Sequence, residues 1–259
     1  MPDIEKIKEY LTEKEIKIIY YEETDSTNKK AREYAKANPE NRTPAVFIAK
    51  RQSAGRGRLG RSFHSDGSGL YISFLLYPSA KGREITAFTP FAAVKLCEAV
   101  EGVAGFEPRI KWVNDLYVNG KKLAGILVEG EMDSDGNLAY IVCGLGINVY
   151  KTALPEEISQ IAISVEEVIS KKISMESLAA SLIDKIIAEA DSFASEELFS
   201  AYLSRLDTLG KDVTVIKANE SYEARAEGLN PDYSLVLSLP DGRKETLFTG
   251  EVSIRAKKD

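Results

Sequence analysis

The sequence predicts a mixed α+β domain over residues 1–208 and a small all-β domain over residues 209–259. Two observations support this division. In the first part, apolar strands alternate with segments whose apolar residues have helical spacing. After Gly210 the chain changes to short alternating strands separated by the turn sequences NPD and PDG. About 50 residues of that kind are typical of a small β-barrel.

The first elements alternate between helix and strand. A short amphipathic helix is predicted at residues 4–12, followed by a strand at IKIIYYEE. The segment TDSTNKKAREYAKAN opens with capping residues, so we expect Ser26 or Thr27 at a helix N-terminus. PAVFIAK is an apolar strand. GLYISFLLY is a second strand, and its nearly continuous hydrophobicity predicts burial on both faces.

A helix at residues 87–100 precedes a predicted β-hairpin. The strands PRIKWVNDLYV and KLAGILVEGEMD are joined through Asn119 and Gly120, a strong two-residue turn signal. LAYIVCGLGINV is a further apolar strand, and a loop with one short turn follows it. We expect one long helix from Met175 to Leu206, and then the strands KDVTVIK, SYEARAEGL, YSLVLSL and KETLFTGEV.

Composition excludes several classes of protein. No run of about 18 apolar residues is present, so no membrane span is predicted. The N-terminus is charged from residue 3 and lacks the apolar segment of a signal peptide, so we expect a cytoplasmic protein. The two cysteines, Cys97 and Cys143, lie far apart among apolar residues, which indicates buried free thiols.

A single histidine, His64, limits the chemistry. A histidine-rich zinc site is excluded, and Ser-His-Asp or Cys-His catalysis would have to use this one residue. Lys, Arg, Asp, Asn and backbone groups remain, and they suit phosphate chemistry, in which positioning and charge neutralisation carry most of the catalysis.

The stretch QSAGRGRLGRSF gathers arginines and glycines in a chain of net charge −6. Between Lys50 and Arg61 there are five positive charges and no acid. The glycines allow backbone N–H groups to approach a ligand closely, and arginine suits phosphate or carboxylate. The Gly-Lys-Ser/Thr ending of a Walker A loop is missing. Alone, the stretch is as compatible with a solvated loop or a nonspecific RNA contact as with a loop that wraps a specific anionic ligand.

Two further clusters are ambiguous when each is taken alone. In KWVNDLYVNGKKLAGIL, Asn114 and Asp115 either cap a turn or serve a site, and Lys122 enters an apolar strand near Gly125. A lysine at the mouth of a buried strand can place a fixed positive charge on a ligand. GLGIN indicates either tight strand packing or the floor of a ligand site.

Together these segments identify a resemblance. DSTN, QSAGRGRLGR, KWVNDLYVNGKKLAGIL, GLGIN and GEVSIR resemble, in order and spacing, the biotin protein ligases, also called biotin–[acetyl-CoA-carboxylase] ligases. The resemblance covers Ile18 to Arg255. It implies a first domain related to class II aminoacyl-tRNA synthetases and an SH3-like C-terminal barrel. Because so few residues precede the first matching strand, we expect the form without the N-terminal DNA-binding domain.

The resemblance implies a two-step ligase reaction. Biotin and ATP give biotinyl-5′-AMP and pyrophosphate, and a lysine of a biotin carboxyl carrier domain then takes the biotin and releases AMP. Mg²⁺ is expected with ATP. The expected partner is the carrier domain of a biotin-dependent carboxylase, with no DNA or membrane partner, and the protein is expected to form a homodimer.

The resemblance also implies the site residues. Arg58 and Lys122 would hold the biotin carboxylate against the α-phosphate; Ser26, Thr27 and Gln52, with Arg56, would bind the ureido ring. Asp115, the third implied catalytic residue, either organises Mg²⁺ or nucleotide or acts as a base for the incoming lysine. The biotin-binding residues are expected to be Ser26, Thr27, Asn28, Gln52, Gly55, Arg56, Gly57, Arg58, Lys122 and Gly125. The nucleotide-binding residues are expected to be Arg58, Arg61, Phe63, Lys111, Asn114, Lys122, Asn148 and Arg255.

Two departures from the family pattern stand out: Val113 replaces a usual proline, and Phe63 replaces a common tryptophan. The arginine loop is expected to order on ligand binding, and YKTALPEEISQ to fold over the nucleotide. Three alternatives remain: a lipoate ligase, a non-catalytic RNA-binding protein and a transcriptional co-repressor. Gln52 with GRGRLGR favours biotin over lipoate, and the acidic charge disfavours RNA.

Overall fold

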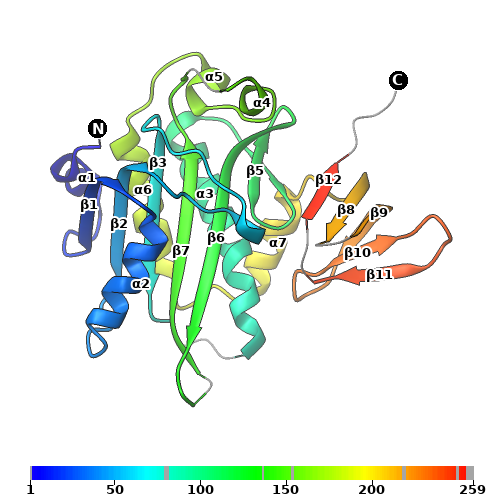
Figure 1. Ribbon diagram of the computed structural model, residues 1–259, viewed down its shortest axis with the longest axis horizontal. Helices are drawn as coiled ribbons and strands as arrows, with labels where there is room; N and C mark the ends of the chain where they lie inside the picture. The colour runs from blue at the N-terminus through cyan, green and yellow to red at the C-terminus, as the bar shows by residue number, and fades with distance from the viewer. Residues whose placement is uncertain are drawn as a thin grey trace.

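The computed structural model describes residues 2–78, 82–135, 137–152, 155–217, 220–248 and 251–254. Two sheets organise these residues (Figure 1). A seven-stranded sheet has the order β1-β2-β3-β7-β6-β5-β4, and a five-stranded sheet beside it has the order β11-β10-β9-β8-β12. The mixed α+β fold of the first part is as predicted.

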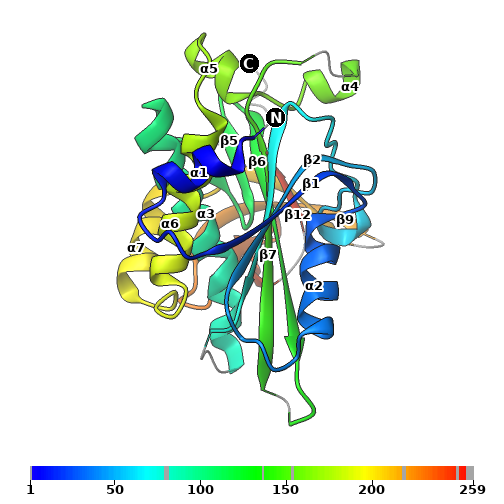
Figure 2. The ribbon, with the colours of Figure 1, turned by 90° about the vertical axis from the view of Figure 1, so that its left-hand side faces the viewer.

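The large sheet carries helices on both faces. Strands β1 (Lys17–Thr24) and β2 (Ala45–Gln52) are connected by α2 (Thr27–Ala37) and pair with each other in parallel. The other strand pairs of this sheet are antiparallel. In Figure 2, α2 covers one face, and the opposite face carries α1 (Ile4–Tyr10), α3 (Phe88–Ala104), α6 (Met175–Glu189) and α7 (Glu196–Arg205). A short 3₁₀ helix, η2 (Gly82–Ala87), leads into α3. Every residue of β3 (Gly69–Leu76) is buried, which confirms the predicted burial of this strand on both faces.

The predicted hairpin is present, with one correction. Asn119 and Gly120, with φ of 51° and 75°, join β5 (Asp115–Val118) to β6 (Lys121–Met132), as their sequence predicts. The first strand, however, is divided. Residues 112–114 form a turn, and β4 (Arg109–Lys111) folds back antiparallel on β5. The buried indole of Trp112 hydrogen-bonds to the Tyr233 carbonyl and not to a neighbouring strand, and the strand ends before residue 112. Strand β7 (Leu138–Asn148) completes the centre of the sheet.

The prediction of one long helix from 175 to 206 is wrong. The chain forms α6 and α7, with a break at residues 190–195. Phe193 leaves the helical path and packs on Phe88, with ring centroids 5.0 Å apart. The Ser195 side chain then accepts a hydrogen bond from the Leu198 N–H and starts a new helix. The short helix α5 (Val165–Ile169) was not predicted, whereas α4 (Glu156–Ser159) is the short turn expected in the loop.

The small sheet follows the predicted alternation, with a further correction. Its strands are β8 (Asp212–Lys217), β9 (Glu220–Leu229), β10 (Leu235–Ser238), β11 (Lys244–Leu247) and β12 (Glu251–Ile254). KETLFTGEV was expected to be one strand but forms β11 and β12 at opposite edges of the sheet. Within the described residues these two strands do not pair, so the sheet is open.

The structure also bears on the two cysteines and on the predicted lack of a membrane span. Cys97 and Cys143 are buried and not disulfide-bonded, as predicted, and burial raises the pKa of both thiols. Among the described residues, no helix combines the length and the apolar character needed to cross a bilayer.

Candidate functional site

One pocket of about 430 Å³ brings the sequence-predicted residues together. Its wall is built from α2, the arginine loop, the turn at residues 112–114, and the ends of β6 and β7. The predicted residues that line it are Ser26, Thr27, Asn28, Gln52, Arg56, Gly57, Arg58, Arg61, Phe63, Lys111, Asn114, Asp115, Lys122, Gly125 and Asn148. Gly55 does not line it, and Arg255 lies outside the described residues.

One end of the pocket is buried and polar, and we call Ser26, Thr27, Asn28 and Gln52 the polar end. The Gln52 Oε1 accepts the Thr27 N–H at 2.8 Å, and its Nε2 donates to Ser65 Oγ at 3.0 Å. Ser26 is the N-cap of α2, but its side chain makes no cap hydrogen bond; Gln52 instead satisfies the backbone N–H of Thr27, the first helical residue.

The two glycines of GLGIN make room for side chains of the pocket. A Cβ on Gly144 would lie 2.0 Å from Asn28 Oδ1, and one on Gly146 would lie 2.4 Å from the Phe63 ring. The tight packing predicted for this segment is confirmed, and the segment also forms part of the pocket wall, whereas its role as the floor of a ligand site stays a prediction.

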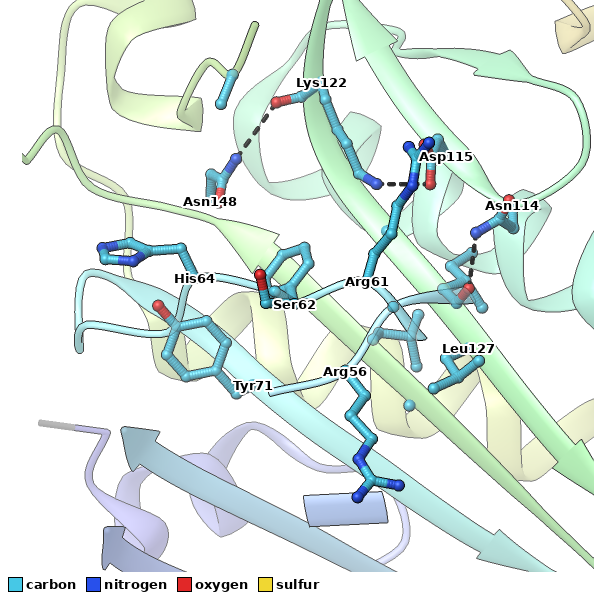
Figure 3. Close-up of a pocket in the computed structure, with 18 of the residues that line it drawn as sticks. Arg56, Arg61, Ser62, His64, Tyr71, Asn114, Asp115, Lys122, Leu127 and Asn148 are labelled. Carbon is cyan, nitrogen blue, oxygen red and sulfur yellow. Dashed lines mark hydrogen bonds and ion pairs between the residues drawn. The ribbon is translucent and has the colours of Figure 1, made fainter. Parts of the chain in front are cut away.

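The arginine loop is a compact hairpin. Arg56 and Ser62 form an antiparallel bridge, the Gly57 N–H donates to Arg61 O at 2.8 Å, and η1 (Arg58–Gly60) is a 3₁₀ turn closed by Gly60 at φ 75°. Arg56 and Arg61 point to opposite sides of the loop (Figure 3). Such a hairpin can present cations to two parts of one ligand.

Gly55 supports this loop from behind. A Cβ there would lie 2.5 Å from Phe63 O and 2.8 Å from Ser65 Oγ, the hydroxyl that holds Gln52. The glycine at this position is therefore explained by packing.

The other end of the pocket is cationic, and we call Arg58, Arg61, Lys111 and Lys122 the cationic end. Lys122 Nζ lies 2.8 Å from Asp115 Oδ1, an ion pair that lacks the angles of a hydrogen bond. Gly125 leaves space for this pair, since a Cβ there would lie 3.0 Å from Lys122 Nζ. Figure 3 shows Arg61 pointing toward the same pair.

Asn114 connects the arginine loop to the turn. Its Oδ1 accepts a hydrogen bond from Arg58 Nη1 at 3.1 Å, and its Nδ2 donates to Ile126 O at 2.9 Å. The capping prediction for Asn114 is confirmed, because its side chain braces the turn; the same side chain also orients an arginine of the pocket, and its role in binding stays a prediction.

The small sheet contacts the same turn. Trp112 Nε1 donates to Tyr233 O at 2.8 Å, and the Trp112 N–H donates to Thr208 Oγ1 at 2.9 Å. Tyr202 Oη donates to Val113 O at 3.2 Å. Val252 of β12 lines the pocket itself. The position of Asn114 and Asp115 therefore depends on residues that follow the large sheet in the chain.

A cluster around Asp66 at the pocket wall was missed by sequence reasoning. Asp66 accepts hydrogen bonds from Ser68 and Thr152, and His64 Nε2 lies 3.8 Å from its Oδ2. Burial raises the pKa of Asp66, but these hydrogen bonds and His64 outweigh burial, so the pKa lies below its ordinary value. Burial and Asp66 raise the pKa of neighbouring Tyr71 to about 12. SFHSDGSG reads as an ordinary polar loop, and no sequence signal marks these residues.

Residues 158–163 border the cationic end. The Lys122 N–H donates to Ile161 O at 2.8 Å, and the Ile163 N–H donates to Lys122 O at 2.9 Å. Asn148 Nδ2 donates to Lys122 O at 3.3 Å (Figure 3). Ile158 and Ile161 add apolar surface to the pocket wall, so the end of YKTALPEEISQ does lie beside the cationic residues.

Comparisons with known proteins show the family to which the chain belongs. Residues 20–148 match the biotin/lipoate A/B protein ligase family. The chain is 33% identical over 223 residues to the bifunctional ligase/repressor BirA of Salmonella typhimurium, covering 84% of this chain and 68% of that protein. The chain belongs to the biotin/lipoate A/B protein ligase family.

The names of two further matched proteins contain the word biotin. The chain is 28% identical to a biotin–[acetyl-CoA-carboxylase] ligase of Paracoccus denitrificans, covering 85% of this chain and 94% of that protein. The structure of the Aquifex aeolicus biotin protein ligase in complex with biotin and ATP superposes with a TM-score of 0.75 at 27% identity, covering 92% of this chain and 98% of that chain.

Proposed function

We propose that this protein is an ATP-dependent biotin protein ligase that forms biotinyl-5′-AMP and transfers biotin to a lysine of a biotin carboxyl carrier domain. One observation carries the proposal. A single pocket of about 430 Å³ joins a buried hydrogen-bonding end to a cationic end, within a chain of this family. That volume lies in the range of roughly 300–1,000 Å³ that suits one small ligand, and an acyl adenylate has the same two-ended character.

The polar end suits the ureido ring of biotin. Ser26, Thr27, Asn28 and Gln52 offer hydrogen-bonding groups where the pocket is buried, and the ureido ring carries two N–H donors and one carbonyl acceptor. We assign Arg56 and Gly57 to the same ligand, because they begin the loop beside this end.

The cationic end suits the adenylation step. The biotin carboxylate attacks the α-phosphorus of ATP, an O–P bond forms, and pyrophosphate leaves. Arg58 and Lys122 neutralise the negative charge that develops, and Asp115 keeps Lys122 aimed at it. Arg61 and Lys111 attract the phosphate chain, while Phe63, Asn114 and Asn148 complete the nucleotide wall.

Mg²⁺ belongs to this proposal as a companion of ATP. In the described part of the chain no group of three or more His, Cys, Asp or Glu residues could hold a metal ion. Asp115 offers one carboxylate, whose Oδ1 is ion-paired with Lys122, and Mg²⁺ in such sites is usually held by one or two carboxylates plus substrate phosphates. The residues therefore fit an ion that arrives with the nucleotide and neutralises phosphate charge.

In the second step the carrier lysine amine attacks the activated carbonyl, an amide bond forms and AMP leaves. We retain Asp115 as a candidate base for this amine.

We further propose that residues 1–208 and 209–259 are separate domains, the second a partly open SH3-like barrel. The cytoplasmic location and a homodimer formed through the large sheet stay predictions, the latter testable by analytical ultracentrifugation.

The first experiment is a pyrophosphate-release assay with purified protein, ATP, Mg²⁺ and either biotin or lipoate. We expect release with biotin, and labelling of a carrier domain when one is added. Release with lipoate alone would assign the protein to the lipoate branch of the family. Release with neither acid would contradict the ligase assignment.

A further inference from the structure

Three side chains stand behind the polar end without lining the pocket. Ser73 on β3 is fully buried, Glu129 lies on β6, and Arg32 lies on α2. Arg32 Nη1 pairs with Glu129 Oε1, and Glu129 Oε2 accepts a hydrogen bond from Asn28 Nδ2 at 2.8 Å. Ser73 Oγ lies within hydrogen-bond distance of both Thr27 and Asn28.

These contacts fix the orientation of the Asn28 amide. Its Nδ2 faces Glu129 Oε2 and, at 3.3 Å, Leu127 O. Both groups are acceptors, so only the amide nitrogen can face them. The Asn28 Oδ1 must therefore be the atom that faces Ser73, at 2.6 Å.

The amide orientation then fixes the hydroxyl protons. Asn28 Oδ1 cannot donate, so the single proton of Ser73 goes to it. Ser73 Oγ is left as an acceptor for Thr27 Oγ1, which lies 2.7 Å away. Gln52 Oε1, which accepts the Thr27 backbone N–H, lies 3.1 Å from Thr27 Oγ1 and is a second, more distant acceptor for the hydroxyl proton. The Thr27 hydroxyl has thus used its only proton inside the wall.

We propose that Glu129, Asn28 and Ser73 form an ordered hydrogen-bond chain that makes Thr27 Oγ1 an acceptor toward the pocket, so that the site selects a ligand presenting an N–H at its polar end. The inference rests on the proposed function: the ureido ring of biotin carries N–H groups, and the dithiolane ring of lipoate carries none. A site built to pair a ligand N–H rejects an analogue that lacks it. Ser73 and Glu129 are positioning residues, since they act through Asn28 and Thr27.

The test measures dissociation constants for biotin and for lipoate by calorimetry, and kcat and KM in pyrophosphate release. In Ser73→Ala the Thr27 hydroxyl loses the acceptor that fixes its proton, which can then turn either to Gln52 Oε1 at 3.1 Å or into the pocket. We expect the biotin Kd and KM to rise about tenfold, as for loss of one ordered hydrogen bond. The kcat, the KM for ATP and the lipoate Kd stay within twofold of wild type. The biotin-over-lipoate preference therefore falls about tenfold.

A second set of variants keeps the proposal testable if Ser73→Ala does not fold. Glu129→Ala removes the acceptor that orients Asn28, and we expect a several-fold loss of biotin affinity alone. Glu129→Gln can still present an oxygen to Asn28 and should recover most of that affinity. The matched control is Glu131→Ala, two residues further along β6, and among the described residues Glu131 is not a hydrogen-bond partner of Asn28.

Two outcomes overturn the proposal: unchanged biotin affinity in both Ser73→Ala and Glu129→Ala, or equal loss of biotin and lipoate affinity with lowered thermal stability. The calorimetric binding measurements separate this inference from the proposed function. Wild-type protein that binds biotin but releases no pyrophosphate contradicts the ligase activity, while the selectivity of the variants is still read from binding. Wild-type protein that does not bind biotin contradicts both.

Discussion

Both the side chain and the backbone of Lys122 are held in place by neighbouring residues. Asp115 holds its Nζ at 2.8 Å, and the backbone N–H and carbonyl on the other side bond to Ile161 and Ile163. Because side chain and backbone are both fixed, the charge is preorganised and needs no rearrangement when negative charge develops on the α-phosphate. We expect Lys122→Ala to slow pyrophosphate release by about 100-fold or more. Single-turnover measurement of biotinyl-5′-AMP formation checks this rate.

The adjacent Lys121 supplies the control for this prediction. Its exposed Nζ donates to Ser159 O, away from Asp115, and Lys121→Ala should keep wild-type kinetics. If the defect of Lys122→Ala came only from the unpaired Asp115 carboxylate, the double variant with Asp115→Asn would recover the rate. Such a recovery would contradict a direct role for Lys122.

Asp66 gives a pH dependence of stability whose sign follows from its environment. Burial raises its pKa, but hydrogen bonds from Ser68 and Thr152 and the charge of His64 prevail and lower it below 3.8. The folded state therefore favours the ionised form. This stabilisation is fully present above pH 3.8 and is lost as the pH falls through the folded-state pKa.

Chemical denaturation of wild type and Asp66→Asn across this pH range checks the sign. The difference in the free energy of unfolding should be constant near neutral pH and shrink as the solution is acidified below about pH 4. A difference that grows on acidification would mean that the folded-state pKa of Asp66 is raised.

At the residue scale, the sequence predicts charged groups better than their supports. Arg58 and Lys122 are predictable because cations and glycines gather around them in an acidic chain. Ser73 and Glu129 are not, because a serine in an apolar strand and a glutamate on a hairpin have many ordinary explanations. Their importance follows from pairing between β3, β6 and α2, which no local pattern encodes.

At the element scale, β7 carries two glycines on one face that serve opposite ends of the pocket. Gly144 makes room for Asn28, and Gly146 makes room for Phe63. We expect Gly144→Ala to raise the biotin Kd at least tenfold, because a Cβ 2.0 Å from Asn28 Oδ1 must displace that side chain. Gly146→Ala should instead raise the KM for ATP by a similar factor through displacement of Phe63.

Calorimetry with biotin and steady-state kinetics with ATP distinguish the two variants. Gly102→Ala in α3, where no atom lies within 4 Å of the added Cβ, is the control for a glycine substitution without contact. Identical defects in the two β7 variants would mean that the strand as a whole shifts, and would contradict separate roles.

The turn at residues 112–114 depends on the helix and strand that follow the large sheet. The buried Thr208 hydroxyl accepts the Trp112 backbone N–H. Thr208→Val leaves that N–H unsatisfied, so we expect a loss of about 1–3 kcal/mol in the free energy of unfolding and a higher KM for ATP. Thr208→Ser keeps the acceptor and should preserve both quantities. Urea denaturation and pyrophosphate release measure them; an unchanged KM for ATP in Thr208→Val would show that the turn keeps its position without this bond.

Element prediction from the sequence succeeds where local signals are strong and fails where packing decides. Asn119 and Gly120 determine a hairpin by their own backbone preferences. The break between α6 and α7 has no glycine or proline, and residues 190–195 alone do not show it. It occurs because Phe193 packs among Phe88 and Phe91, contacts that exist only in the folded chain.

At the scale of the whole molecule, the order of motifs predicts more than any single motif. The α+β fold and most of the pocket were predicted from five segments whose order and spacing together resemble one family. The sequence predicts that the small domain reaches the nucleotide through Arg255, which lies outside the described residues; the contacts seen here, made by the Tyr233 carbonyl and Val252, carry no chemical signature and were not predictable. The open edge of that sheet likewise follows from the placement of β11 and β12 at opposite ends.

The single tryptophan of the chain reports on how the two sheets are joined. Trp112 is 4% exposed and donates its indole N–H to Tyr233 O, while the Tyr233 ring packs against Tyr202 with centroids 5.4 Å apart. Tyr233→Ala removes the ring that holds this carbonyl in place. In urea we expect wild-type tryptophan emission and far-ultraviolet circular dichroism to change together, because the joint is buried and hydrogen-bonded.

In Tyr233→Ala the emission should shift to longer wavelength at a lower urea concentration than the loss of secondary structure. That separation would mean that the small sheet leaves the turn before the large sheet unfolds, as expected of two domains divided near residue 208. The KM for ATP should rise in the same variant without urea, whereas the biotin Kd stays constant, because the polar end is built and supported by α2 and by strands of the large sheet. Coincident transitions in the variant would indicate one cooperative unit and contradict the proposed division.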